Sequence, residues 1–306
     1  MPDSVISVSG LRKSYGELDA VRGIDLEVGR GEIFAFLGPN GAGKTTTVEI
    51  LEGYRRRSAG TVQVLGEDPG RVDREWRERI GIVLQDSSMH AELSVRESLE
   101  LFAGYYRRPR EVDDTIELVG MTAKANERVA RLSGGQRRRL DVALALIGDP
   151  ELLFLDEPTT GFDPSARRRA WSVVGSLRDL GKTVFLTTHY MEEAQALADR
   201  VAIIAGGLIV AHGSPAELAG RDAATRITFK LPPGVAGSDL PPALAASVGN
   251  GQVSLHVDDP VPMLHQLTAW ALERRVPLSG LEVRRPSLED VYLELTAVHA
   301  GEEPGE

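Results

Sequence analysis

Hydrophobic residues follow two patterns along the chain, and together these patterns predict an α/β protein. Short apolar runs at Ile33–Leu37, Leu152–Leu155 and Val184–Thr188 indicate strands buried on both faces. Apolar and polar residues alternate at Val5–Val8 and Ile24–Val28, which predicts antiparallel strands with one exposed face. Further strands are expected at Thr61–Leu65 and Ile80–Leu84, and a hairpin at Val201–Ala205 and Leu208–Val210.

Residues 91–147 change to a helical period, which predicts a helical subdomain inserted between two core strands. Ser94 and Glu97 form a capping box at its start. The apolar stripes of its three helices are Val95, Leu99, Phe102 and Tyr106, then Val112, Ile116 and Val119, then Leu140, Ala143, Leu144 and Ile147. Later helices are expected from Asp163-Pro164 to about Leu180, at Met191–Ala198 and from Ser214-Pro215.

The composition of the sequence changes after Gly220, where prolines and glycines separate segments with a weak strand pattern. We therefore expect a main domain at 1–220 and a small C-terminal α+β domain at 221–306, with a disordered tail at 301–306. The expected strands of the small domain are Thr225–Lys230, Val253–Val257 and Leu281–Arg284, and its helices carry Leu264, Leu267 and Ala271, then Leu288, Val291, Tyr292 and Leu295.

The segment GPNGAGKTT follows the apolar run Ile33–Leu37 and precedes an apolar helical pattern. Strand, glycine loop and helix are the context in which G-x-x-x-x-G-K-[ST] predicts a phosphate-binding loop. Backbone N–H groups of such a loop surround phosphate oxygens, and the positive end of the helix points at the same place. Lys44 is expected between the β- and γ-phosphates, and the Thr45 hydroxyl on Mg²⁺. The predicted nucleotide-binding residues are Gly38, Pro39, Asn40, Gly41, Ala42, Gly43, Lys44, Thr45 and Thr46.

Two carboxylates, Asp156 and Glu157, follow the buried strand Leu152–Leu155. Adjacent carboxylates at the carboxyl edge of a buried strand are costly unless a cation or substrate uses them. Asp156 suits the surroundings of Mg²⁺, and Glu157 suits a base that polarises water toward the γ-phosphate. His189 ends the next buried strand, and its position at the same edge favours a γ-phosphate contact over a structural role.

Two further residues are ambiguous when they are considered alone. Tyr15 could pack on a strand or stack on adenine, and packing is the simpler interpretation. Gln85, at the end of a predicted strand, could reach Mg²⁺ or the attacking water, or be an ordinary polar strand end.

The segment Leu132-Ser133-Gly134-Gly135-Gln136 opens the third helix of the predicted subdomain. A serine, two glycines and a helix N-terminus form a second anion-binding surface. The run Arg137-Arg138-Arg139 that follows is interpreted as a solvated helix face rather than a nucleic-acid patch, because it is isolated in an acidic chain.

Composition narrows the class of protein further. The 306 residues carry a formal net charge of −10, which argues against a general nucleic-acid binder. There is no cysteine, so disulfides and Cys-ligated zinc are excluded. The N-terminal residues lack the pattern of a secretory signal, and the longest apolar run, Val201–Ala211, is far short of the about 20 residues that span a bilayer. A soluble chain is expected.

Taken in order, the phosphate loop, Gln85, Leu132–Gln136, Asp156-Glu157 and His189 resemble the ATP-binding subunit of an ABC transporter over residues 4 to 220. The resemblance implies a P-loop NTPase cassette with a mixed sheet core, an antiparallel β-subdomain and a helical subdomain. By this resemblance, Tyr15 stacks on adenine, and Gln85 contacts Mg²⁺ and the attacking water. The resemblance also makes His189 the catalytic switch histidine and Asp163 part of the loop that meets a second subunit. Phe162 departs from the leucine that is more frequent in the family.

The resemblance implies that two chains meet head to tail in a homodimer with bound ATP between them. Ser133, Gly134, Gly135, Gln136 and Asp163 would then act in trans, on the nucleotide held by the other copy, and Glu157 would direct hydrolysis. Such subunits contact a membrane permease through the segment from Gln85 into the first inserted helices. They lie in the cytoplasm on the inner face of the membrane.

Two stretches, from Val48 to Tyr54 and from Pro286 to Leu293, resemble the daunorubicin-resistance type of exporter ATPase. These ATPases pair with ABC-2-type permeases, which implies drug export with ATP and Mg²⁺ and no contact with nucleic acid. One competing hypothesis is a non-transport ABC protein that acts on DNA or ribosomes, although a single cassette without cysteine argues against it. Another is a regulatory module that binds ATP without hydrolysis, against which Glu157 argues.

Overall fold

The computed structural model describes residues 4–83, 90–220, 225–231, 235, 239–240, 248–249, 252–284 and 288–300. The chain divides into two compact units, one formed by the residues up to Pro215 together with those from Leu295 onward, and one by Ala216–Glu294. This division falls slightly before the expected boundary at residue 220 and places the end of the last helix in the first unit. The predictions for Gln85 and for the tail 301–306 lie outside the described residues.

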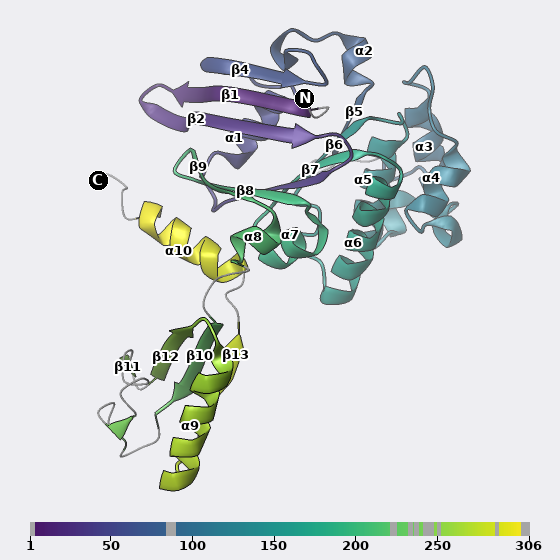
Figure 1. The fold of residues 1–306 in the computed structure, drawn as a ribbon. Helices are drawn as coiled ribbons and strands as arrows, with labels where there is room; N and C mark the ends of the chain where they lie inside the picture. Colours follow the sequence, from purple (N-terminus) through teal and green to yellow (C-terminus); the bar gives the residue numbers. More distant parts are fainter. Residues whose placement is uncertain are drawn as a thin grey trace. The chain divides into compact units, whose positions relative to one another are not determined.

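Two sheets form the first unit (Figure 1). An antiparallel sheet has the order β2-β1-β4, with bounds β1 Ser4–Tyr15, β2 Leu18–Gly29 and β4 Ala59–Val64. A second sheet has the order β5-β6-β7-β3-β8-β9 and is parallel except for the β8-β9 pair. Its strands are β3 Ile33–Leu37, β5 Ile80–Val83, β6 Leu152–Asp156, β7 Thr183–Thr188, β8 Arg200–Ala205 and β9 Leu208–Gly213.

The core of the first unit is shared by these two sheets and helix α1 (Lys44–Leu51). Buried phenylalanines from neighbouring strands meet at Phe185, whose ring centroid lies 5.5 Å from that of Phe34. Trp76 is buried and donates its indole N–H to the Val64 carbonyl at 2.9 Å. The apolar character of both strand faces explains why the parallel sheet is covered on both sides.

Three helices, α3 (Val95–Ala103), α4 (Val112–Leu118) and α5 (Gly134–Leu146), lie in the segment for which the sequence predicts a helical subdomain, and they contact one another. The capping box of Ser94 and Glu97 is confirmed. Tyr106, expected on the apolar stripe of α3, instead lies past the end of that helix. The first unit also contains α2 (Arg74–Arg77), α6 (Pro164–Asp179), α7 (Met191–Leu197), η1 (Pro69–Arg71), η2 (Thr122–Lys124) and η3 (Val129–Arg131). Helix α8 (Pro215–Leu218) begins at the last residue before the division between the units.

The second unit contains an antiparallel sheet of order β11-β12-β10-β13 and a long helix. The apolar residues of the sheet and the helix share a separate core that includes Phe229, Leu267 and Trp270. The elements are β10 Thr225–Lys230, β11 Val248–Gly249, β12 Gln252–Val257, β13 Glu282–Arg284 and α9 Pro260–Arg274, and the last helix of the chain is α10 Leu288–Ala300.

Three neighbouring parallel strands determine where chemistry can take place. β6, β7 and β3 are adjacent in the sheet, so their carboxyl ends meet at one edge. The phosphate loop follows β3, Asp156 ends β6, and His189 follows β7. No helix in the described ranges is long and apolar enough to cross a membrane.

Candidate active site

A cleft of about 620 Å³ gathers at this edge most of the residues that the sequence predicts for nucleotide binding and hydrolysis. It lies within the first unit, and its walls come from β1, β2, the phosphate loop and the ends of β6 and β7. The lining residues are Tyr15, Leu18, Ala20, Asn40, Gly41, Gly43, Lys44, Thr45, Thr46, Asp156, Glu157 and His189.

The glycines of the phosphate loop allow the backbone to approach other chain segments closely. A Cβ on Gly38 would lie 2.4 Å from the Ile204 carbonyl oxygen, and one on Gly43 would lie 2.5 Å from that of Ala20. Gly41 and Gly43 also have φ angles of +81° and +104°, which favour glycine. Glycine at positions 38 and 43 therefore allows the loop to pack directly against the main chain of Ile204 and Ala20.

Lys44 begins helix α1 and is buried. Its ammonium group donates to the carbonyl oxygens of Gly38 at 2.7 Å and Pro39 at 3.0 Å. Burial lowers the pKa of this lysine, while the nearby Glu157 and Asp156 carboxylates oppose the shift. A bound anionic phosphate would add a further favourable partner for the charged form.

Asp156 and Glu157 are both anchored to β7. The Thr187 hydroxyl donates to the Asp156 carboxylate. The Glu157 N–H lies 3.1 Å from the Thr187 carbonyl oxygen and 3.2 Å from its hydroxyl oxygen. Thr187 therefore orients both acidic residues, a role that sequence reasoning missed although the residue directly precedes Thr188 and His189.

The Glu157 carboxylate faces His189. Its Oε1 atom lies 3.1 Å from the His189 Nδ1 atom, and its Oε2 atom accepts a hydrogen bond from the Thr160 hydroxyl at 2.9 Å. Glu157 has a φ angle of +45°, an uncommon conformation for a residue with a side chain. Such a conformation persists where the surroundings hold it, and it occurs often at active sites.

Tyr15 lines the cleft and is 38% exposed. The Lys13 ammonium lies 4.8 Å and the Arg55 guanidinium 5.3 Å from its ring centroid. Arg55 is in turn paired with Glu49 of α1. Tyr15 is therefore not buried in the core, and it lines the cleft together with the phosphate loop.

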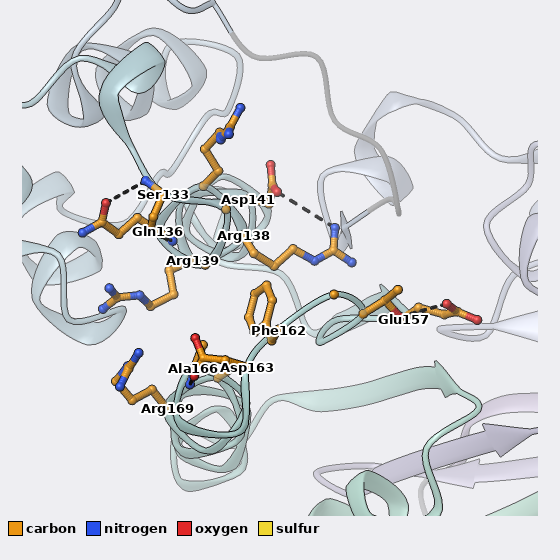
Figure 2. Close-up of a pocket in the computed structure, with 16 residues that line it drawn as sticks. Ser133, Gln136, Arg138, Arg139, Asp141, Glu157, Phe162, Asp163, Ala166 and Arg169 are labelled. Atoms are coloured by element: carbon orange, nitrogen blue, oxygen red, sulfur yellow. Dashed lines mark hydrogen bonds and ion pairs between the residues drawn. The ribbon is translucent and has the colours of Figure 1, made fainter.

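A second cavity of about 680 Å³ lies beside the N-terminal ends of α5 and α6 (Figure 2). Ser133 caps α5, and its N–H donates to the Gln136 side chain at 2.9 Å. Asp163 caps α6, accepting from the backbone N–H groups of Ser165 and Ala166, and these bonds lower the pKa of its carboxyl. Gly134 and Gly135 also line this cavity.

The predicted residues thus fall into two groups. One cleft is lined by Tyr15, residues 40–41 and 43–46 of the phosphate loop, Asp156, Glu157 and His189, and the other cavity by residues 133–136 and Asp163. Gly38, Pro39 and Ala42 are not among the residues that line the cleft. Glu157 lines both the cleft and the other cavity. Residues 133–136 therefore do not line the cleft that contains the phosphate loop of the same chain.

Two buried charged residues of this region were not anticipated. Arg138 was expected on a solvated face but is buried, and its guanidinium reaches the main chain around Glu157, because α5 packs directly against that loop. Glu193 is fully buried and accepts from the Thr159 hydroxyl at 2.8 Å and the Trp171 indole N–H at 3.1 Å. The positions of Arg138 and Glu193 relative to the recognised motifs did not indicate that these side chains are buried or which groups they contact.

Comparison with known proteins identifies the family. A family model described as ABC transporter matches residues 21–160, and a C-terminal domain model of ABC-transporter-like proteins matches residues 225–287. The daunorubicin resistance ATP-binding protein DrrA3 of Streptomyces coeruleorubidus is 39% identical, with 97% of each chain covered.

The chain belongs to the ABC transporter ATPase family. It is an ATP-binding subunit that hydrolyses ATP, as its family membership shows. A second relative, the Nod factor export ATP-binding protein I of Ralstonia nicotianae, is 39% identical over 95% of this chain and 94% of its own.

Solved structures share the fold of this ABC ATPase and confirm the predicted fold class. The cbiO1 protein of Clostridium perfringens, part of the ABC transporter complex cbiONQ, matches with a TM-score of 0.66 and 28% identity, over 72% of this chain and 92% of that one. A dimeric ATP-binding cassette in a post-hydrolysis state with ADP and phosphate matches with a TM-score of 0.61 and 24% identity, over 68% of this chain and 98% of that one.

Proposed function

We propose that this ABC ATPase powers export through a separate ABC-2-type permease by closing head to tail on ATP as a homodimer. The protein lies at the cytoplasmic face of the cell membrane, where it contacts the membrane only through the permease. It has no nucleic-acid partner. The separation of the phosphate loop from Ser133–Gln136 carries the dimer proposal, because one chain presents two half-sites in different cavities.

The export direction and the substrate class rest on relatives. One is named for daunorubicin resistance and another for Nod factor export, and both align over almost the whole chain. A drug-like or other hydrophobic molecule is therefore the proposed substrate, and antibiotic resistance the proposed consequence. Co-purification of this chain with an ABC-2-type permease from membranes would test the assignment; recovery with a permease of another class would overturn it.

Each group of residues has a proposed role in hydrolysis. Tyr15 stacks on adenine, residues 38–46 hold the phosphates, and Lys44 neutralises the β- and γ-phosphates. Tyr15 and residues 40–41 and 43–46 line the cleft, which supports these roles. Glu157 accepts the proton of the attacking water, and His189 holds Glu157 and the γ-phosphate in register. From the partner chain, Ser133, Gly134, Gly135, Gln136 and Asp163 close the site.

The residues of the cleft fit a magnesium ion bound together with the nucleotide. Thr45 and Asp156 line the cleft, and the Thr187 hydroxyl fixes the orientation of the Asp156 carboxylate. The described residues include no cluster of three or more acidic, histidine or cysteine ligands. Mg²⁺ commonly uses one or two protein ligands with phosphate oxygens and water, and it neutralises developing charge on phosphate. We propose Thr45, Asp156 and Gln85 as its ligands.

A Glu157→Gln variant tests the assignment of the base. It should bind ATP and form a dimer in light scattering, yet release no phosphate above background. Glu192→Gln is a matched control, because Glu192 is an exposed glutamate on α7 that does not line the cleft. Turnover by Glu157→Gln at the rate of the unmodified protein would exclude Glu157 as the base.

Mixing two inactive variants tests the half-sites directly. Lys44→Ala removes the phosphate ligand, and Ser133→Arg obstructs the second cavity. If the sites form in trans, the mixed dimer contains one intact site, in which the normal Lys44 of one chain faces the normal Ser133 of the other. ATPase activity should therefore appear on mixing. If mixing restores nothing while each variant still binds its unmodified partner, the head-to-tail arrangement is wrong.

A further inference from the structure

The loop that carries Glu157 is held from one side by the helix that begins at Ser133. Arg138 lies in the second turn of α5, and its side chain extends toward this loop (Figure 2). Its Nη2 atom donates to the Asp156 carbonyl oxygen, and its Nε atom to the Pro158 carbonyl oxygen at 3.3 Å. The guanidinium therefore bridges the two carbonyls that flank Glu157.

This bridge is buried and is oriented by a second charge on the same helix. Arg138 and Asp141 are each 9% exposed, and the Nη1 atom lies 3.9 Å from the Asp141 carboxylate. Hydrogen bonds that involve a charged group gain strength where water is excluded. A planar guanidinium has donors in a fixed geometry, so it can contact two carbonyl oxygens at once, whereas a lysine ammonium is a point charge.

The main-chain conformation of Glu157 requires stabilising hydrogen bonds from its surroundings. Its φ angle of +45° is unfavourable for a residue with a Cβ. From β7, Thr187 holds the Glu157 N–H. From α5, Arg138 holds the carbonyls of the residues before and after Glu157. The position of the catalytic carboxylate thus depends on contacts from two sides, and one of these comes from the helix whose first turn carries Ser133.

We propose that Arg138 is a positioning residue that holds Glu157 in its catalytic conformation and links that conformation to the helix capped by Ser133. The inference rests on the proposed trans dimer. In that dimer, docking of α5 on the partner's ATP alters the position of Arg138, and through it the Glu157 that acts on the chain's own ATP. Closure of one nucleotide site then changes the position of Glu157 in the other site through the Arg138 side chain.

Kinetics of Arg138→Met and Arg138→Lys test the positioning role. Misplacing a reacting group by about 1 Å can cost about a hundredfold in rate, so we expect kcat of Arg138→Met to fall by about that factor. The Kd for ATP should change by less than about threefold, since Arg138 is not among the residues that line the nucleotide cleft. Arg138→Lys, which can reach one carbonyl, should lie between. Equal losses of kcat and ATP affinity, or an unchanged kcat, would overturn the proposal.

Arg110→Met serves as a matched control for stability. Arg110 is also largely buried, and its Nη1 atom lies 3.1 Å from the Asp149 carboxylate. Asp149 lies shortly before the first residue of β6, whereas Asp156 is the last residue of that strand. Arg110→Met should lower the melting temperature as Arg138→Met does but leave kcat within about twofold. A fall in kcat of the control equal to that of Arg138→Met would assign the effect to stability and not to Glu157.

Mixed dimers then separate action within a chain from action across the interface. In a dimer with one Glu157→Gln chain, turnover depends on the Glu157 of the other chain. Arg138→Met on the chain with the intact Glu157 should abolish most of this turnover, whereas Arg138→Met on the Glu157→Gln chain should leave most of it. The reverse pattern would show that Arg138 serves the partner's nucleotide instead. Failure of the proposed dimer itself would be visible separately, as absence of complementation between Lys44→Ala and Ser133→Arg.

Discussion

The Nδ1 atom of His189 lies 3.1 Å from the Oε1 atom of Glu157, although 32 residues separate them in the sequence. The pair forms because β6 and β7 are neighbours in the parallel sheet and end at the same edge. The His189 ring also packs on Tyr190, with ring centroids 4.0 Å apart. The histidine is therefore oriented by a carboxylate on one side and an aromatic ring on the other.

Loss of this histidine should affect hydrolysis more than binding. Positioned acid–base groups contribute about 10² or more to rate, so His189→Ala should lower kcat about a hundredfold. The affinity for ATP, measured by fluorescence titration, should change little because the phosphate loop is intact. His212→Ala is the control, since His212 lies on β9 and does not line the nucleotide cleft. Wild-type turnover of His189→Ala would contradict a role in catalysis.

A methyl group on Gly43 should abolish nucleotide binding. The Cβ would lie 2.5 Å from the Ala20 carbonyl oxygen, and the φ angle of +104° is strained for alanine by about 1–3 kcal/mol. The loop would have to move away from β2, which distorts its main chain. Calorimetric titration of Gly43→Ala with ATP should show no binding.

Gly175→Ala controls for the addition of a methyl group as such. Gly175 lies inside α6 with no atom within 4 Å of the added Cβ, so the change should leave binding intact. It should also raise stability by up to about 1 kcal/mol, because alanine favours helices more than glycine does. Normal ATP affinity of Gly43→Ala would show that the loop tolerates the shift.

Tyr15 should determine affinity for the base through its ring and not its hydroxyl. Stacking of an aromatic side chain on a base contributes about 1–3 kcal/mol, so Tyr15→Ala should raise KM for ATP about tenfold with little effect on kcat. Tyr15→Phe should retain most of the affinity, and Tyr15→Trp should retain or improve it. Steady-state ATPase assays measure both constants. A larger loss with Tyr15→Phe than expected would point to the hydroxyl.

Stability should fall with rising pH because of Glu52, which is buried at the end of α1. Burial raises the pKa of its carboxyl to about 8, and the Asp156 and Glu49 carboxylates add to this rise. The folded state therefore favours the protonated form, whereas the unfolded chain ionises near the ordinary value of 4.5. The contribution to stability is full below about pH 4.5 and is lost progressively as the pH rises through about 8.

Glu52→Gln should remove this dependence. The variant should be close in stability to the unmodified protein in nucleotide-free unfolding experiments at about pH 4 and exceed it at about pH 9. Each unit of pKa shift corresponds to about 1.4 kcal/mol, so a gain on the order of a few kcal/mol is the upper limit at pH 9. Glu192→Gln, an exposed change on α7, should leave the pH dependence unaltered. Parallel pH profiles of Glu52→Gln and the unmodified protein would contradict the prediction.

The strands and helices of this chain were largely predictable because their signals are local. The period of apolar residues, the capping box at Ser94 and the cap at Asp163 depend on neighbours within a few positions. The phosphate loop and the segment Leu132–Gln136 are also short contiguous patterns. The sequence by itself therefore predicted the fold class and the family, which are both confirmed, and it supplied the residues of the proposed nucleotide site.

Only the tertiary structure decided which of these residues meet. The order of strands in the sheet places Glu157 next to His189. It also places Thr187 where its hydroxyl contacts the Asp156 carboxylate and the Glu157 N–H. Packing of α5 on the loop after β6 buries Arg138, whose local surroundings in the sequence are polar and predict exposure. Burial and hydrogen bonding between distant segments depend on the arrangement of the whole chain, and no window of neighbouring residues contains that information.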